Sequence, residues 1–367
     1  MNRKIKFFLL GLVFWFLLFL GWEWWTSYPR VRFGAVPPPE TFEEKIDSIL
    51  TNSLTQYLIP GIAVGIVKEE KVIYLKAFGY ANLATKDSMR LDSTFPVASV
   101  SKLITALGTA NYALEKGLSP KTKLDCLSIR QNKLPNKIGN LSLINLLQHR
   151  TGLKETLSLE GYLKRNQKTP LLDLMNSLSE SEPDTTAYYS DLNFDLLGYV
   201  LEKAENQEFS KLIDQRILRI GGMESSFFTE DWPLDYLPAM GYQQTFLWKR
   251  LEPVDTHFGH HPSPSSGLLT TAEDMSKLLL HLSREDMGVF SEELRWLRHE
   301  SETPAGFQQI SLNKMDFMGH YGGQGGFSAL LIYSPKLDLG LFLMSNSHDK
   351  ADFRNQIASQ LLPLLTR

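Results

Sequence analysis

The stretch FPVASVSKLITALGTANYALEKG, Phe95 to Gly117, combines a helix start with a reactive pair of side chains. Its apolar spacing predicts a helix from about Ser99 to Gly117, a residue that favours helix ends. Ser99 and Lys102 stand three residues apart, so both lie on one face of the first turn. A helix start stabilises negative charge, and a desolvated lysine can accept a proton. Ser99 is either a nucleophile beside its base, Lys102, or a helix cap beside a surface lysine.

A second candidate stretch is YYSDLNFDLLGYVLE, Tyr188 to Glu202. Tyr189 precedes a predicted helix, and Asp191 follows two residues later. A tyrosine beside a cationic lysine ionises more easily and can act as a base. The alternative is that Tyr189 only packs while Ser190 or Asp191 caps the helix.

A third candidate is GHYGGQGGFSALLIY, Gly319 to Tyr333, in which five glycines are expected to flank the start of a strand. Glycine permits close approach of a ligand to the backbone. His320 is expected at the beginning of that strand. The alternative is that His320 is an ordinary hydrogen-bonded histidine with no part in chemistry.

The N-terminal segment has the pattern of a membrane anchor. An unbroken apolar run, Phe7 to Trp22, follows three basic residues and leads into a tryptophan cluster. Basic residues before such a run hold the N-terminus in the cytoplasm, and tryptophans suit the far membrane–water boundary. No small-x-small cleavage site follows, which favours a retained anchor over a cleaved signal peptide. We therefore expect residues 7–25 to lie in the lipid bilayer and the rest of the chain outside the cytoplasm.

Composition excludes several other classes. The chain has 367 residues, a net charge of -3 and 43% hydrophobic residues, so a nucleic-acid partner is not expected. Neither a Walker-type nor a Rossmann glycine motif occurs, so a nucleotide cofactor is not indicated. Cys126 is the only cysteine, which rules out an intramolecular disulfide and suggests a bystander. His257, His260 and His261 stand close together, but no carboxylate or cysteine completes a recognisable metal spacing.

The order of predicted elements indicates a mixed α/β fold of the α+β type. Residues 1–26 form the predicted anchor, residues 27–41 a proline-rich linker that reads as a stiff spacer, and residues 42–367 the main domain. GIAVGIV and KVIYLKAFGYA predict a hairpin, and FSALLIYSPKLDLGLFLMSN predicts two further strands. The outer parts, 42–98 and 255–367, are predicted to form one antiparallel sheet around an inserted helical part, 99–254.

The three candidate stretches occur in an order that resembles a known superfamily. Ser-x-x-Lys, Tyr-x-Asn/Asp and His-x-Gly before a strand are similar to the serine β-lactamases and penicillin-binding proteins. The likeness is greatest to the branch of class C β-lactamases, D-alanyl-D-alanine carboxypeptidases and esterases. LLQHRTGL, GGMESS and SGLLTTAEDMSKLL also match, and the resemblance covers roughly residues 42–365. It implies a β-lactamase/transpeptidase-like fold, an antiparallel sheet flanked by helices with a helical subdomain inserted.

The resemblance also implies residue roles. Ser99 would be the acylated nucleophile, and Lys102 and Tyr189 would share the base and acid work. His320 would take the place of the lysine in the family's Lys-Thr-Gly triplet. The oxyanion hole would be the N–H groups of Ser99 and Gly323.

Gly322 and Asp191 complete the implied substrate-binding set. No metal and no organic cofactor would be needed. Two departures matter, because Asp191 replaces the commoner asparagine and His320 replaces lysine. A lysine there helps to hold the β-lactam carboxylate, so its loss favours an esterase or peptidase over a true β-lactamase.

The resemblance therefore predicts a membrane-anchored serine hydrolase acting on an ester, an amide or a D-amino-acid peptide. Its substrate would be a small molecule or a peptidoglycan-type peptide. Its catalytic domain would face outward from the cell membrane, into the periplasm in a Gram-negative bacterium. The alternative is a non-catalytic sensor or scaffold that keeps the fold without turnover. Labelling by a fluorophosphonate or a fluorescent penicillin separates the two.

Overall fold

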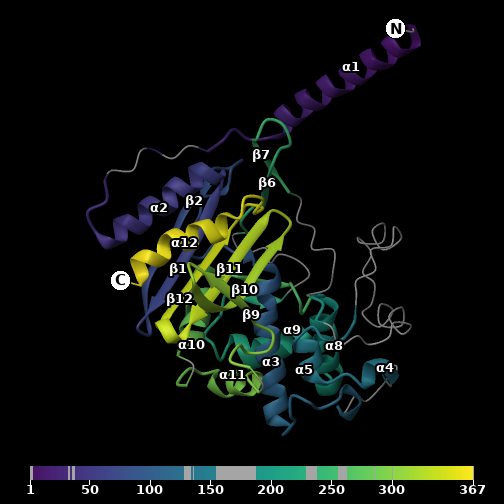
Figure 1. Ribbon diagram of the computed structural model, residues 1–367, viewed down its shortest axis with the longest axis vertical. Helices are drawn as coiled ribbons and strands as arrows, with labels where there is room; N and C mark the ends of the chain where they lie inside the picture. The colour runs from purple at the N-terminus through teal and green to yellow at the C-terminus, as the bar shows by residue number, and fades with distance from the viewer. Residues whose placement is uncertain are drawn as a thin grey trace.

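The computed structural model describes residues 3–31, 34, 38–127, 134, 136–153, 187–228, 238–254, 263–284, 286–299 and 301–366 (Figure 1). His257, His260 and His261 lie outside these residues, as does most of the segment between Gly152 and Tyr188.

The centre of the molecule is a seven-stranded sheet in the order β3-β2-β1-β12-β11-β10-β9, with every neighbouring pair antiparallel. Its two halves, far apart in sequence, join where β1 pairs β12, with Ile62 opposite Ser345. The predicted fold class is confirmed, and so is the N-terminal hairpin. The strands are β1 (Gly61–Lys68), β2 (Lys71–Asn82), β3 (Asp87–Ser88), β9 (Gln308–Leu312), β10 (Met315–Gln324), β11 (Phe327–Ser334) and β12 (Leu339–Ser345).

The glycine-rich stretch differs from its expected placement. His320 does not lie at the start of the following strand but inside a strand of its own, β10, where it pairs with Leu331 of β11. The turn between the two strands falls on Gly325 and Gly326, both with positive φ. Glycine has no Cβ to oppose that conformation, so the glycines serve this turn as well as the site.

One face of the sheet is covered by α2 (Phe42–Tyr57) and α12 (Phe353–Leu365), which lie side by side (Figure 1). Helix α2 begins with a capping box, in which Thr41 accepts from the Glu44 N–H and Glu44 accepts from the Thr41 N–H. Alternate strand residues point to this face and form one core. That core includes Ile46, Leu50, Val64, Ile332, Leu341 and Ile357.

The opposite face carries the helical part, which surrounds a long buried helix, α3 (Ser101–Glu115). The other helices there are α4 (Asn136–Gly139), α5 (Leu143–Leu147), α8 (Leu192–Glu205), α9 (Phe209–Ile213) with a π-helical turn (Asp214–Leu218), α10 (Ala272–Ser283) and α11 (Ser291–Leu297). Helix α10 packs directly on β1 and β12, and its N-cap, Thr271, accepts from the Asp274 N–H.

Five short strands lie outside the main sheet. One small sheet consists of β4 (Phe95–Pro96), β8 (Leu268–Thr270) and β5 (Phe227–Phe228). The other two strands, β6 (Tyr242–Gln244) and β7 (Leu251–Pro253), form a separate hairpin. Residues 99–254 are therefore not purely helical. The boundaries given for the sheet and helical parts remain predictions.

Helix α1 (Arg3–Thr26) projects from the body next to the β6–β7 hairpin (Figure 1). Judged by length and composition alone, α1 is the one helix among the described residues that could cross a membrane. Only Glu23 of this helix is buried. Residues Ser27 to Arg30, which open the predicted spacer, are bonded to the hairpin rather than free.

The join between β1 and β12 provides a test of the core packing. A Cβ on Gly65 would lie 2.1 Å from the Phe342 ring, closer than nonbonded atoms approach. We expect Gly65→Ala to lower the free energy of unfolding by about 1–3 kcal/mol, as overpacked cores do. Chemical unfolding of the full chain in detergent measures the loss. Phe342→Leu should restore much of it in the double variant, and equal losses in both backgrounds would contradict this packing.

Candidate active site

Ser99 lies in a tight turn that the rest of the fold holds in place. The turn is a 3₁₀ helix, Ala98–Val100, which leads directly into α3. Ala98 has φ 47, in the left-handed region that residues other than glycine and asparagine rarely adopt. Ser101 fixes the turn, since its Oγ donates to the Ala98 carbonyl at 2.5 Å and accepts from the Leu268 N–H at 2.9 Å. The Ser99 side chain itself is half-buried and open to a ligand.

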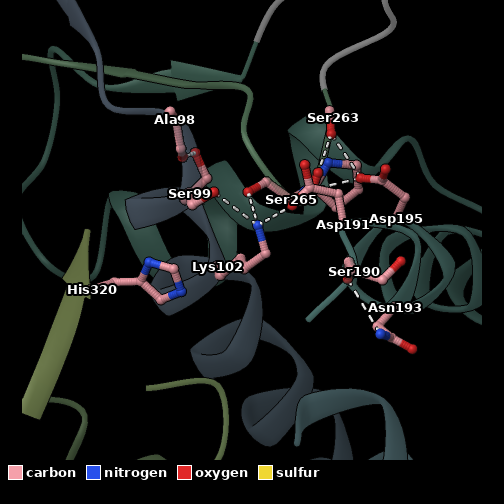
Figure 2. A network of polar contacts seen from close by, with 12 residues as sticks. Ala98, Ser99, Lys102, Ser190, Asp191, Asn193, Asp195, Ser263, Ser265 and His320 are labelled. Carbon is pink, nitrogen blue, oxygen red and sulfur yellow. Dashed lines mark hydrogen bonds and ion pairs between the residues drawn. The ribbon is translucent and has the colours of Figure 1, made fainter. Parts of the chain in front are cut away.

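Lys102 is fully buried, so it is not a surface lysine. Its Nζ donates to Ser99 Oγ at 3.1 Å, to Asp191 Oδ1 at 2.6 Å and to the Ser265 carbonyl at 3.0 Å (Figure 2). An ammonium group has three N–H donors, and these acceptors use all of them. The arrangement therefore fits a charged Lys102 that holds the Ser99 hydroxyl.

Asp191 occupies the N-cap position of α8, but its side chain makes no capping hydrogen bond. Its carboxylate instead forms an ion pair with Lys102. The cation is buried while the carboxylate is 39% exposed, so water reaches one partner only. Tyr189 also lies close to Lys102, whose Nζ is 5.0 Å from the centroid of the Tyr189 ring.

Asp195 and Ser265 belong to the same network, and the sequence analysis missed both. Asp195 Oδ1 accepts from Ser263 Oγ at 2.7 Å and from the Ser265 N–H at 3.0 Å (Figure 2). This holds the Ser265 carbonyl where Lys102 can reach it. Burial raises the pKa of the Asp195 carboxyl, although the hydrogen bonds from Ser263 and Ser265 oppose that shift. The spacing of Asp191 and Asp195 by one helical turn was a usable signal.

Tyr189 meets its neighbours through its ring. The Lys102 Nζ lies 5.0 Å from the ring centroid, and the His149 ring packs against it at 4.5 Å. Among the described residues, no hydrogen bond joins the Tyr189 hydroxyl to Ser99 or Lys102. A role as base would require the Tyr189 hydroxyl to turn toward Ser99 when substrate binds. Tyr189 is 45% exposed, which leaves room for such a movement.

His149 was a second omission, although the quoted stretch LLQHRTGL contains it. Its Nδ1 accepts from the Ser190 N–H at 3.2 Å, next to Tyr189 in the chain. Burial, assisted by the Lys102 charge, lowers the pKa of His149 to about 4. A neutral imidazole therefore supports the Tyr189 ring at neutral pH.

His320 is 2% exposed and lies 6.0 Å from the Tyr189 ring, centroid to centroid. Its Nδ1 lies 2.6 Å from the Tyr321 carbonyl, which can only accept, so Nδ1 carries the proton. Burial lowers the pKa of His320 to about 3, and the Lys102 charge acts in the same direction. The side chain is therefore neutral, whereas a lysine at this position would bring a positive charge.

The two candidate glycines have different surroundings. A Cβ on Gly322 would lie 2.0 Å from the Val97 carbonyl oxygen, so only glycine lets β10 lie against the strand that leads to Ser99. Gly323 is exposed, and a Cβ there would meet nothing within 4 Å. It borders a cavity of about 270 Å³ whose lining includes Ser328 and Arg354 but not Ser99, Lys102 or Tyr189.

Cys126 is not one of the residues of this network. Cys126 is exposed in the turn Leu124–Cys126. Within the part of the chain that the structure describes, no group of three or more His, Cys, Asp or Glu side chains could hold a metal ion.

The depressed pKa of His320 predicts an acid-sensitive fold. An unfolded histidine titrates near 6.5 and the folded His320 near 3, so the unfolded chain binds the proton first and stability falls as pH drops below 6.5. At pH about 4.5 this should cost about 2 kcal/mol relative to pH 7. The His320→Gln variant lacks this histidine, so its free energy of unfolding should fall correspondingly less between pH 7 and pH about 4.5. Chemical unfolding of the full chain at both pH values measures the difference. Parallel pH dependence in both proteins would contradict a buried, neutral His320.

Comparisons with known proteins agree with this geometry. The model of the Beta-lactamase family matches residues 46–364. Protein flp of Staphylococcus aureus (strain MW2) is 23% identical over 327 residues, which cover 83% of this chain and 63% of flp, so the chain spans under two thirds of that relative. A beta-lactamase of Psychrobacter immobilis is 24% identical over 362 residues and 86% of each chain.

Solved structures share the fold at low sequence identity. The octameric penicillin-binding protein homologue of Pyrococcus abyssi has a TM-score of 0.72 and 22% identity, over 87% of this chain and 77% of its own. The D-alanine carboxypeptidase AmpC of Burkholderia cenocepacia has a TM-score of 0.70 and 20% identity, over 88% of this chain and 98% of its own. A class C beta-lactamase has a TM-score of 0.71 and 18% identity, over 88% of this chain and 96% of its own. Since the family model spans most of the sequence, the chain belongs to the beta-lactamase family.

Proposed function

We propose that this protein is a membrane-anchored serine hydrolase that works through an acyl-enzyme on Ser99. The observation that carries the proposal is the hydrogen bond from the buried Lys102 to Ser99 Oγ at 3.1 Å. A buried cation placed on a half-buried serine has no evident structural need, since a hydrophobic residue would fill the same space at lower cost. Family membership supports the serine hydrolase class.

In the first step Ser99 Oγ attacks the carbonyl carbon of the substrate and loses its proton. Lys102 holds the hydroxyl, but all three of its protons are engaged, so we assign the larger part of the proton acceptance to Tyr189. The Lys102 Nζ lies 5.0 Å from the centroid of the Tyr189 ring, so the two groups are close enough to act on the same proton. The same groups return the proton to the leaving group.

The negative oxygen of the tetrahedral intermediate then needs donors. The N–H groups of Ser99 and Gly323 are the proposed pair, since Gly323 is exposed and Gly322 brings β10 against Val97, two residues before Ser99. Water hydrolyses the acyl-enzyme in the second step, with Tyr189 and Lys102 handling the proton again.

The charges around Ser99 bear on the substrate. His320 is neutral where a lysine would offer a cation, and Asp191 places a carboxylate beside Lys102. Both features disfavour an acyl group that carries an anion close to the reacting carbonyl. We therefore propose a neutral or amine-bearing ester, amide or D-amino-acid peptide as substrate, in preference to a β-lactam.

The proposal places the enzyme at the cell membrane. Helix α1 has 24 residues, or about 36 Å at the usual rise, against a hydrocarbon core of about 30 Å. The intact chain should therefore stay in the membrane fraction after an alkaline carbonate wash.

Removal of the nucleophile tests the reaction. Ser99→Ala should abolish labelling by a fluorophosphonate and lower ester hydrolysis on the order of a thousandfold or more, because the acyl-enzyme can no longer form. Ser88→Ala, at an exposed serine on β3, is the matched control and should keep both activities. Ser101→Ala is a poor control because Ser101 is buried and bonded to Ala98 and Leu268. Full turnover by Ser99→Ala would exclude the mechanism, and an unlabelled, inactive wild type would favour a scaffold.

The charge of Asp191 provides a second test. Asp191→Asn removes the anion that stabilises the Lys102 ammonium, so more Lys102 should be available as a base at a given pH. We expect acylation by a neutral p-nitrophenyl ester to need less alkaline conditions, and acylation by nitrocefin to improve. Pre-steady-state acylation rates over a pH series measure both effects. An unchanged pH profile together with an unchanged substrate preference would remove Asp191 from the mechanism.

A further inference from the structure

The end of helix α1 is held by the tip of the β6–β7 hairpin. We call residues 245–250, which connect β6 to β7, the hairpin tip. Figure 1 shows this hairpin at the point where α1 leaves the body of the protein. The proposed catalytic network does not involve either element.

Glu23 is the centre of this contact. It is 2% exposed, and its carboxylate accepts the backbone N–H groups of three successive tip residues. The donors are Phe246 at 2.5 Å, Leu247 at 3.2 Å and Trp248 at 3.2 Å. A buried carboxylate is costly unless hydrogen bonds satisfy it. Here both carboxylate oxygens are satisfied by the tip, so the acid on an otherwise apolar helix has a defined partner.

Side chains reinforce the contact on both sides of Glu23. The Trp248 indole N–H donates to the Leu20 carbonyl at 3.1 Å, and its ring meets the Trp24 ring edge-on at 5.3 Å. The Arg250 guanidinium lies 4.1 Å from the Trp24 ring centroid and donates to the Ser27 carbonyl at 2.8 Å. Cation–π and charge-assisted contacts of this kind fix orientation as well as distance.

The chain beyond α1 continues the contact through an isolated antiparallel β-bridge between Tyr28 and Leu251. The Tyr28 N–H donates to the Leu251 carbonyl at 2.7 Å, and the Leu251 N–H donates back to Tyr28 at 3.2 Å. Arg30 then donates to the Lys249 carbonyl at 3.0 Å. The hairpin thus grips the last turn of α1 and the first residues after it.

The outer surface of the tip is apolar and aromatic. Phe246 is 75% exposed, and Leu247 and Trp248 are each more than 40% exposed. They lie next to the end of α1, whose Trp22, Trp24 and Trp25 are also exposed. Aromatic side chains with a polar atom favour the membrane–water boundary, where one end is apolar and the other wet.

We infer that the hairpin tip is a second membrane contact, which lies in the lipid headgroup layer beside the end of α1. The inference rests on the membrane anchor proposed above. Lipid is the occupant because the exposed tip residues continue the surface of a membrane-length helix, at the level where that helix leaves the bilayer. Removal of α1 as a cleaved signal peptide would leave these N–H donors without the Glu23 carboxylate.

A fluorescent label on the tip tests the inference in the full chain. The double variant Cys126→Ser, Phe246→Cys has its cysteine at the hairpin tip, where an environment-sensitive dye is attached. The labelled protein is reconstituted in phosphatidylcholine–phosphatidylglycerol vesicles. Lipids with a quencher near the headgroup should quench this dye strongly. The same dye on the native Cys126, which is exposed in the helical part, should remain unquenched. Adding Glu23→Ala should reduce the quenching at position 246 several-fold, whereas Glu40→Ala, at an exposed acid in the linker, should not.

The outcomes separate the tip from the anchor. An intact, carbonate-resistant chain whose label at position 246 stays in water overturns the tip contact and leaves the anchor standing. A shortened chain recovered in the soluble fraction overturns both. Strong quenching that Glu23→Ala leaves unchanged overturns the proposed grip, because the tip would then reach the lipid without it.

Discussion

The site depends on one buried cation. Lys102 is removed from water and balanced by acceptors from three separate segments: Ser99 before α3, Asp191 at the start of α8, and Ser265 before β8. A buried charge is tolerated only when such partners are present, so the three segments must meet for α3 to pack. Asp195 adds a further tie, since it holds the segment that carries Ser265.

The sheet contributes the other wall of the site through a close backbone approach. Gly322 lets β10 come against Val97, and the Arg354 guanidinium of α12 reaches around the sheet edge to the Gly322 and Ala329 carbonyls. Helix α12 lies on the face of the sheet away from α3, so this contact links the two cores. The position of Gly323 relative to Ser99 is consequently fixed by both halves of the molecule.

Local signals in the sequence were enough for most elements. The β1–β2 hairpin and the two strands β11 and β12 were predicted from residues close together in the chain, and the structure has each of them. Strand β10 was missed because glycine has low strand propensity, which hid a strand paired on both sides. Asp195 and His149 were missed because their partners lie 70 and 41 residues away. The proline-rich spacer was judged from composition alone, which does not reveal that Tyr28 pairs with Leu251.

The grip of the hairpin on α1 would limit how the catalytic domain moves. The base of the hairpin bonds to the sheet at the turn after β10, where the Tyr242 N–H donates to the Gly326 carbonyl at 3.1 Å. A rigid path then runs from the helix end to the strand that carries His320 and Gly323. With α1 as the proposed membrane anchor, a domain held in this way would, unlike a loosely tethered one, keep Ser99 at one height and one tilt above the lipid. Its encounters would then take place within a thin layer, where a substrate tied to the same surface is present at a far higher effective concentration than one dissolved in bulk water.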